Sequence, residues 1–120
     1  MSSVKRILVV DDEAGFARLL KLGLERTGRY DVRVENRARG ALESAREFEP
    51  HLILLDCLMP EMDGREVAVL MRADEKVKRT PIVFLTGLPG GSEDGPQPSL
   101  GKLSSLDEIV SSIERHLGAS

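Results

Sequence analysis

Three short runs of apolar residues constrain the fold of this 120-residue chain more than any other feature of its sequence. The runs are Ile7 to Val10, Leu52 to Leu55 and Ile82 to Leu85, and none of them alternates apolar with polar side chains. Continuous apolar runs of this length are typical of strands that are covered on both faces, as in a parallel sheet. The runs therefore predict three central strands of such a sheet.

Segments with the apolar spacing of helices separate these runs, and one more follows the last of them. Their apolar stripes are Phe16, Leu19, Leu20 and Leu24; Ala38, Ala41, Leu42 and Ala45; Val67, Leu70 and Met71; and Leu106, Ile109, Val110, Ile113 and Leu117. Ser105, with Glu108 three residues later, is a predicted cap of the final helix. A weaker strand is predicted over Asp31 to Glu35, at an edge of the sheet. This alternation indicates an α/β domain with helices on both faces of the sheet.

The segment Gly87 to Pro98 interrupts the alternation at the place where a fourth helix is expected. It holds four glycines and three prolines in twelve residues. In a helix interior proline costs about 3 kcal/mol and glycine about 1 kcal/mol, so a loop is predicted here in place of a regular helix. The last strand is then short, over Ser99 to Lys102. With no internal repeat or second core pattern, we expect residues 1–120 to form one domain.

The composition of the chain excludes several classes of protein. The 17 basic and 20 acidic residues give a net charge of -3, which provides no general attraction to nucleic acid or to an anionic membrane. Cys57 is the single cysteine, so an internal disulfide is excluded and a reducing compartment is favoured. No apolar run approaches the roughly 18 residues that a membrane span needs. A cytoplasmic protein without nucleic-acid or membrane partners is predicted.

Charged and polar residues follow the apolar runs at the point where each predicted strand ends. They are Asp11 and Asp12, Asp56, Thr86 and Lys102. Ligands of an open parallel sheet gather at the carboxyl ends of its strands, so these side chains are expected to converge. Three adjacent carboxylates repel one another and favour a divalent cation, and a set of oxygen ligands favours Mg²⁺. In the simpler alternative, Asp11 and Asp12 only cap the first helix and Asp56 is an ordinary residue at a strand end.

The sequences VVDDE, LLDCLMPEMDG and FLTG, with a lysine before the last helix, resemble the receiver domain of response regulators of two-component signalling. The resemblance covers nearly the whole chain. It implies a flavodoxin-like, doubly wound sheet of five parallel strands, here with the fourth helix shortened or replaced by the loop. Pro60, Asp63 and Gly64 are then residues of the turn into the third helix.

The resemblance also implies a role for each residue of the cluster. Asp56 is the phospho-acceptor, Asp11, Asp12 and the Leu58 carbonyl complete an Mg²⁺ site with Asp56, Thr86 is the switch hydroxyl, and Lys102 contacts the phosphoryl group. Phosphoryl transfer depends on positioning and charge neutralisation, which these residue types provide. The implied donor is a histidine kinase or a histidine phosphotransfer protein in a phosphorelay. No enzymatic activity is expected beyond phosphorylation and dephosphorylation of Asp56 itself.

Three departures from the family pattern keep other functions open. Leu103 replaces the proline that usually follows the lysine, Ser99 replaces an aromatic switch residue, and Lys102 comes only 16 positions after Thr86. A degenerate receiver that acts as a phosphorylation-independent docking module is therefore the main alternative. A phosphatase with Asp56 as nucleophile is a weaker one, because Leu58 stands where a second acid is needed. Since the sequence ends soon after the last helix, the signal is expected to leave through another protein.

Overall fold

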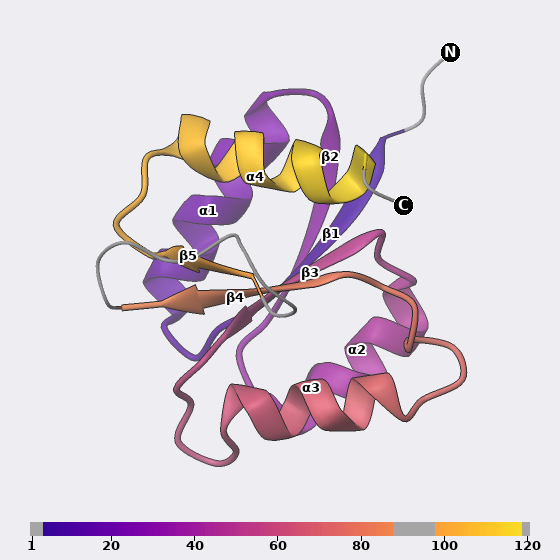
Figure 1. Ribbon diagram of the computed structural model, residues 1–120. Coiled ribbons are helices and arrows are strands. Elements are labelled where there is room, and N and C mark those ends of the chain that lie inside the picture. Colours follow the sequence, from indigo (N-terminus) through magenta and orange to yellow (C-terminus); the bar gives the residue numbers. More distant parts are fainter. Residues whose placement is uncertain (1–3, 88–97, 119–120) are drawn as a thin grey trace.

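The five strands form one parallel sheet with the order β2-β1-β3-β4-β5, as Figure 1 shows. The structure is a computed structural model, and it describes residues 4–87 and 98–118. The strands are β1 (Lys5–Val10), β2 (Tyr30–Glu35), β3 (Leu52–Asp56), β4 (Ile82–Thr86) and β5 (Ser99–Gly101). The predicted five-stranded, flavodoxin-like parallel sheet is confirmed, and the weaker strand candidate does lie at an edge of the sheet.

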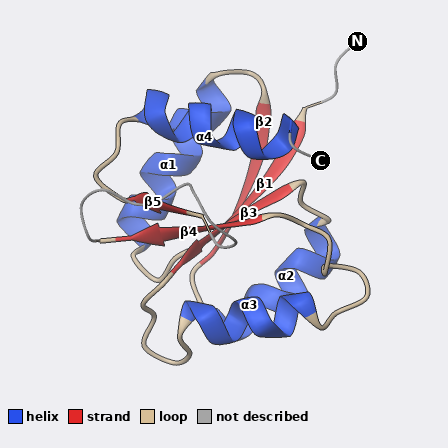
Figure 2. Cartoon of the chain, viewed as in Figure 1, coloured by secondary structure: helices blue, strands red, loops and turns tan. Residues whose placement is uncertain are grey.

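Helices connect the strands and cover both faces of the sheet. They are α1 (Ala14–Arg26), α2 (Ala41–Phe48) with a preceding 3-10 turn η1 (Ala38–Gly40), α3 (Gly64–Arg72) and α4 (Leu106–Gly118). α1 and α4 pack on one face, and α2 and α3 pack on the other (Figure 2). In the described part of the chain, no helix has the length and apolar character that crossing a membrane requires.

The segment between β4 and β5 is only partly described. Residues 88–97 lie outside the described residues, so the loop predicted over Gly87 to Pro98 stays a prediction. The short last strand is confirmed, and it ends at Gly101, one residue before the predicted end.

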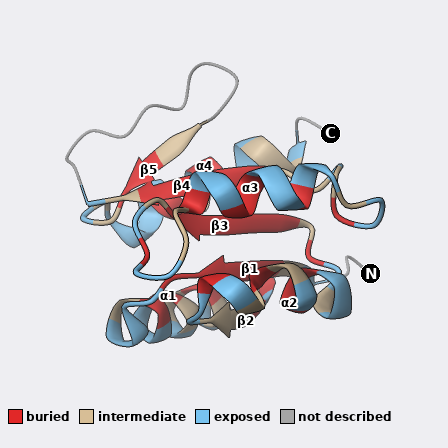
Figure 3. Ribbon diagram, turned by 90° about the horizontal axis from the view of Figure 1, so that it is seen from below, coloured by how far each residue is buried: buried red, intermediate tan, exposed pale blue. Residues whose placement is uncertain are grey.

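The central strand β3 belongs to both hydrophobic layers of the molecule. Leu52 and Leu54 pack with α1 and α4, whereas Ile53 and Leu55 pack with α2 and α3. Because successive side chains of a strand point to opposite faces, a strand covered on both sides needs an apolar residue at every position. All four side chains are fully buried, and Figure 3 shows β1 and β3 as buried strands between helices whose outer faces are exposed.

The apolar stripes of the helices are wider than the surfaces that the sheet covers. On α1, Leu20 and Leu24 are buried, but Leu19 is 72% exposed. On α3, Val67 and Met71 are buried, but Leu70 is 45% exposed. The assignment of Leu19 and Leu70 to the packed stripe was therefore wrong, because residues at the border of a helical stripe point past the sheet into solvent.

Two helices begin with reciprocal caps. Asp63 accepts a hydrogen bond from the Arg65 amide at 2.9 Å and forms a capping box with Glu66 at the start of α3. At α4, the Ser105 amide donates to Glu108 at 2.9 Å, and the Glu108 amide donates to the Ser105 hydroxyl at 3.2 Å. The predicted cap of the last helix is confirmed. The cap of α3 fixes the start of this helix directly after the loop that follows β3.

A buried tyrosine joins the edge strand β2 to the C-terminal helix. The Tyr30 hydroxyl donates to the carboxylate of Glu114 on α4 at 2.6 Å. Burial and the Glu114 carboxylate together raise the pKa of Tyr30 to about 12. We expect Tyr30→Phe to lower the free energy of unfolding by about 1 to 2 kcal/mol at pH 8, because the variant leaves Glu114 without this donor.

The Tyr30→Phe difference is expected to depend on pH. The folded-state pKa of Tyr30 lies above its ordinary value of 10.0, so the contribution is complete below about pH 10 and is lost as the pH rises toward 12. Urea denaturation of both proteins between pH 8 and pH 11 measures this change. A difference that stays constant over this range would mean that the hydroxyl does not stabilise the fold through its proton.

Candidate functional site

The carboxyl ends of the strands bring the predicted site residues to one edge of the sheet. Asp11 follows the last residue of β1, Asp56 ends β3, Thr86 ends β4, and Lys102 follows the last residue of β5. β3, β4 and β5 are paired in parallel register at these ends. The convergence that was expected from the ends of the apolar runs is therefore found in the structure.

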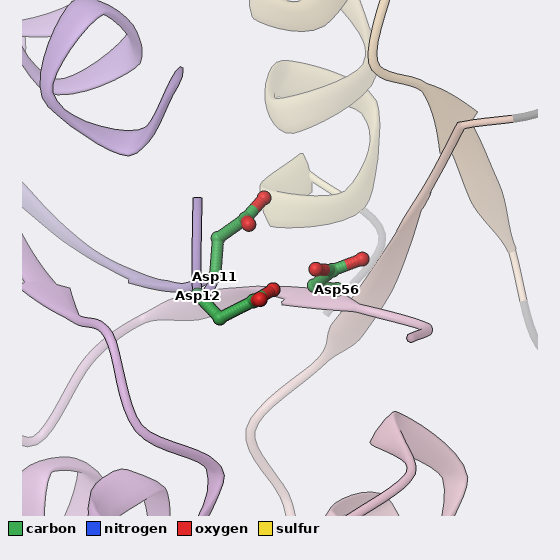
Figure 4. Close-up of side chains that lie close together, drawn as sticks. All are labelled: Asp11, Asp12 and Asp56. Carbon is green, nitrogen blue, oxygen red and sulfur yellow. The ribbon is translucent and has the colours of Figure 1, made fainter. Parts of the chain in front are cut away.

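Three carboxylates form a compact cluster at this edge. Asp11, Asp12 and Asp56 each offer one oxygen, and these oxygens lie within 4.8 Å of one another. Figure 4 shows the three side chains lying close together. Asp11 and Asp56 are only 0% and 3% exposed, whereas Asp12 is exposed. The cluster thus has two buried members and one member that faces solvent.

Asp11 combines a structural role with an available oxygen. Its Oδ1 accepts a hydrogen bond from the Glu13 amide at 2.9 Å, directly before α1. The Asp11 amide donates to the Glu35 carbonyl at 3.0 Å, and the Asn36 side chain donates to the Asp11 carbonyl at 2.9 Å. The alternative in which Asp11 only caps the first helix therefore explains the hydrogen bond that Oδ1 accepts. It does not explain why Oδ2 is buried although this oxygen accepts no hydrogen bond from the described residues.

The backbone around Asp56 is fixed by the start of α3. The Leu58 amide donates to Asp56 Oδ1 at 3.3 Å, and the Gly64 amide donates to the Cys57 carbonyl at 2.9 Å. A Cβ atom added to Gly64 would lie 2.1 Å from the Asp56 carbonyl oxygen. The sequence pattern assigned Gly64 only to a turn, whereas the structure shows that it allows a close approach to the backbone of Asp56.

The cluster is short of positive charge. Burial, followed by the charge of Asp11 and the neighbouring carboxyl of Asp12, raises the pKa of Asp56 to about 7. The nearby Lys102 ammonium and the Leu58 amide oppose this rise without cancelling it. Asp56 Oδ2 is also buried without a hydrogen-bond donor among the described residues. One oxygen on Asp11 and one on Asp56 are thus buried without an accepted hydrogen bond, with one lysine ammonium beside both, and this arrangement favours a further cation.

Lys102 lies directly beside the two buried carboxylates. Its side chain is 12% exposed, and its Nζ lies 3.0 Å from Asp11 Oδ2 and 3.2 Å from Asp56 Oδ2. Neither oxygen accepts a directed hydrogen bond, so these contacts are ionic. Nζ also pairs with the carboxylate of Glu13. Burial alone would lower the pKa of Lys102, but the contacts with Glu13 and Asp11 outweigh it, and the pKa is raised.

The replacement of proline by Leu103 does not move Lys102 away from the site. No peptide bond among residues 4–87 and 98–118 is cis, so the bond between Lys102 and Leu103 is trans. The Lys102 amide donates to the Thr86 carbonyl at 2.7 Å, which continues the pairing of β4 with β5. The Leu103 side chain is 89% exposed. Backbone pairing with β4 therefore places the lysine at this edge in the absence of proline.

The donor set suits a hard divalent cation. Carboxylate oxygens are preferred ligands of Mg²⁺, and the three aspartates supply them without any nitrogen or sulfur ligand. Leu58 lies two residues after Asp56, and its side chain is 78% exposed. The group predicted to bind the metal ion is its backbone carbonyl. Thr86 is half-buried at the end of β4. The roles predicted for all six site residues remain predictions.

Comparison with known proteins identifies the family of the chain. Residues 7–93 match the response regulator receiver domain. The response regulator MtrA of Mycobacterium tuberculosis, a DNA-binding protein, is 40% identical over 100 residues, which cover 75% of this chain and 42% of MtrA. The regulatory protein PhoP of Bacillus subtilis is 43% identical over 82 residues, which cover 68% of this chain and 33% of PhoP. The chain belongs to the receiver domain family of two-component signalling, and it spans less than half the length of these curated relatives.

Solved structures with a similar fold are also receiver domains. A CheY-like receiver protein from Methanospirillum hungatei has a TM-score of 0.82 and 25% identity, and the match covers 98% of this chain and 96% of that one. The receiver domain of a sensor histidine kinase from Pseudomonas aeruginosa has a TM-score of 0.83 and 27% identity, with 97% and 99% covered. That structure contains a magnesium ion coordinated in its active-site cleft.

Proposed function

We propose that residues 1–120 are a single receiver domain in which Asp56 accepts a phosphoryl group in an Mg²⁺-dependent reaction. The observation that carries the proposal is the cluster of three carboxylates beside one lysine, with a buried oxygen on Asp11 and another on Asp56 that accept no hydrogen bond. Membership of the receiver family and the magnesium ion in the Pseudomonas relative support it.

Asp11, Asp12 and Asp56 would hold the metal ion, together with the carbonyl group of Leu58. When bound, Mg²⁺ neutralises negative charge on the phosphoryl oxygens and on the carboxylate cluster. The chain fixes two of these ligands in advance, because Asp11 is held by Glu13 and Asn36, and the Asp56 backbone is held against Gly64. Ligands that are fixed in advance lose little conformational freedom on binding.

Asp56 acts as the nucleophile in this proposal. One carboxylate oxygen forms a bond to phosphorus, and the bond from phosphorus to the donor breaks with its electron pair going to the leaving group. A phosphorylated histidine of a histidine kinase or phosphotransfer protein is the proposed donor. Lys102 donates to a phosphoryl oxygen, since its Nζ already lies 3.2 Å from Asp56 Oδ2. After the transfer, the Thr86 hydroxyl at the end of the neighbouring strand moves to donate a hydrogen bond to a phosphoryl oxygen.

The new phosphoryl group changes the charge at the edge of the sheet. It brings about -1.5 to -2 charges at neutral pH, next to the loops that follow β3 and β4. A local charge of this size alters the arrangement of a surface if that surface has two states of similar free energy. We propose that the altered surface binds a downstream protein, and that neither nucleic acid nor membrane is the direct partner.

Phosphoryl incorporation from acetyl phosphate tests the proposal. We expect the intact mass to increase by one phosphoryl group in the presence of Mg²⁺, and to remain unchanged in EDTA or after Asp56→Ala. The substitution Asp31→Ala is the matched control, because Asp31 is exposed on the edge strand β2 and should leave incorporation intact.

A negative result would decide between the alternatives. If Mg²⁺ and the phosphodonor change neither the mass nor the binding of partners, the docking module becomes the better description. Continuous release of phosphate from a phosphomonoester would instead indicate a phosphatase. Incorporation that survives Asp56→Ala would place the acceptor elsewhere and would overturn the proposal.

A further inference from the structure

Glu13 contacts the site from the start of α1 but has no part in the proposed phosphorylation chemistry. It lies between Asp12 and α1, and its carboxylate pairs with the ammonium group of Lys102. The two residues are 89 positions apart in the chain, so only the fold brings them together. The Glu13 side chain is 62% exposed, which makes it the solvent-facing partner of a lysine that is 12% exposed.

Existing contacts already occupy the ammonium group of Lys102. Its carboxylate partners are Asp11, Asp56 and Glu13. The aromatic ring of Phe16, on α1, lies with its centroid 5.3 Å from Nζ. A lysine ammonium has three N–H donors. Two of them donate to Glu13 and to Asp11 Oδ1, so a phosphoryl group on Asp56 competes with these partners for the lysine.

The burial of the partners decides which of them is released. Asp11 is fully buried, so losing the lysine would leave a charge that water cannot solvate. Asp56 carries the phosphoryl group and remains a partner. Glu13 is exposed, and water replaces a lost ion pair there at little cost. Glu13 is thus the partner whose contact with Lys102 is the easiest to break.

We propose that Glu13 is a positioning residue that shares the Lys102 ammonium with Asp11 and Asp56 in the resting site and releases it to the phosphoryl group. This inference rests on the proposed function of Asp56. In the resting protein the Glu13 carboxylate competes with Asp56 for the lysine. After phosphorylation the larger negative charge on Asp56 wins this competition, and the carboxylate of Glu13 turns to water.

Removing the charge of Glu13 tests the inference. We expect Glu13→Gln to increase the rate of phosphorylation by acetyl phosphate by about two- to five-fold, the range that corresponds to one exposed ion pair. The gain should shrink as salt is added, because exposed charges are screened. The matched control is Glu47→Gln, which removes the exposed ion pair between Glu47 on α2 and Arg33 on β2 and should leave the rate unchanged.

A second substitution separates the lysine contact from simple repulsion of an anionic donor. The phosphorylation rate of Lys102→Met is measured at a higher concentration of acetyl phosphate, with and without Glu13→Gln. In this background Glu13→Gln is expected to give less than about a third of the rate increase that it gives in the parent, since the ion pair between Glu13 and Lys102 no longer exists. If the double variant retains the full gain, the effect of Glu13 is general repulsion and the inference is overturned. An unchanged or lower rate in Glu13→Gln alone would overturn it as well.

The lysine contact can also be observed without phosphorylation. In metal-free protein, the ¹H–¹⁵N resonance of the Lys102 ammonium is expected to shift in Glu13→Gln and to stay in place in Glu47→Gln. If the resonance does not move and the parent protein is phosphorylated normally, the role of Glu13 is contradicted, whereas the proposed function of Asp56 is not. If no variant accepts a phosphoryl group, the release step fails together with the proposed function of Asp56, whatever the resonance shows.

Discussion

In metal-free buffer at pH 8, the substitution Asp56→Asn is expected to raise the free energy of unfolding by about 2 to 3 kcal/mol. Asp56 is 3% exposed, and burial with the charge of Asp11 raises the pKa of its carboxyl group to about 7. Above that pH the fold has to accommodate a buried carboxylate that it disfavours. Asparagine has a similar shape and no charge. The expected gain is smaller than the pKa alone implies, because the variant also loses the ion pair with Lys102 and water screens the edge of the site.

The stability difference is expected to grow with pH. The folded-state pKa of Asp56 lies above its ordinary value of 3.8, so the folded protein keeps a proton that the unfolded chain releases between about pH 4 and pH 7. The free energy of unfolding of the parent therefore falls as the pH rises through this window. The increase in the free energy of unfolding caused by Asp56→Asn should be small near pH 4 and largest above pH 7. Urea denaturation in EDTA measures it.

Magnesium and a control variant complete this test. If Mg²⁺ binds only the folded parent, a concentration one hundred times the dissociation constant adds about 2.7 kcal/mol to its free energy of unfolding. Asp56→Asn should gain much less, because one of the three carboxylates is lost. The control Asp31→Asn removes an exposed charge on β2 and should follow the parent in both respects. An Asp56→Asn variant no more stable than the parent at pH 8 would contradict the buried-charge account.

The substitution Gly64→Ala is expected to lower the free energy of unfolding by about 2 to 4 kcal/mol. The new Cβ atom would lie 2.1 Å from the Asp56 carbonyl oxygen and 3.1 Å from the Cys57 Cα atom. Both neighbours are backbone atoms, so neither can rotate away as a side chain would. Relief of the clash has to move α3 or the end of β3, and the second movement displaces Asp56. We therefore also expect weaker stabilisation by Mg²⁺.

Gly15→Ala is the matched control for this prediction. Gly15 lies in the first turn of α1, and an added Cβ atom meets nothing within 4 Å. The same chemical change should therefore raise the free energy of unfolding by roughly 0.5 to 1 kcal/mol, because alanine is the better helix residue. Thermal or urea denaturation compares the two variants directly. Equal stability of Gly64→Ala and the parent would show that α3 can shift freely against the site.

Much of the fold is predictable because its strands are buried on both faces. The runs around Val9, Leu54 and Val83 have no polar position, and this pattern by itself indicates central parallel strands. The ends of these runs then locate Asp11 and Asp56. The outer limits of each helix stripe are harder to predict, as the exposed Leu19 and Leu70 show, because they depend on how much of each helix the sheet covers.

The contacts that tune the site are not predictable from the sequence. Glu13 and Lys102 are far apart in the chain, and nothing in their local sequence indicates that they pair. Gly64 carries the signal of a turn, whereas its close approach to the Asp56 carbonyl depends on the packing of α3. The raised pKa of Asp56 is equally a property of the assembled site, since burial and Asp11 produce it.

The position of β3 determines how far a disturbance at Asp56 can spread. This strand lies at the centre of the sheet that separates the two hydrophobic layers, with Leu54 in one layer and Leu55 in the other. Interiors packed at this density deform little, so a displacement of the strand end by a few tenths of an ångström has to be shared by both layers. Helices on opposite sides of the molecule are therefore mechanically linked through one strand, and surfaces on either side are able to respond to the same event.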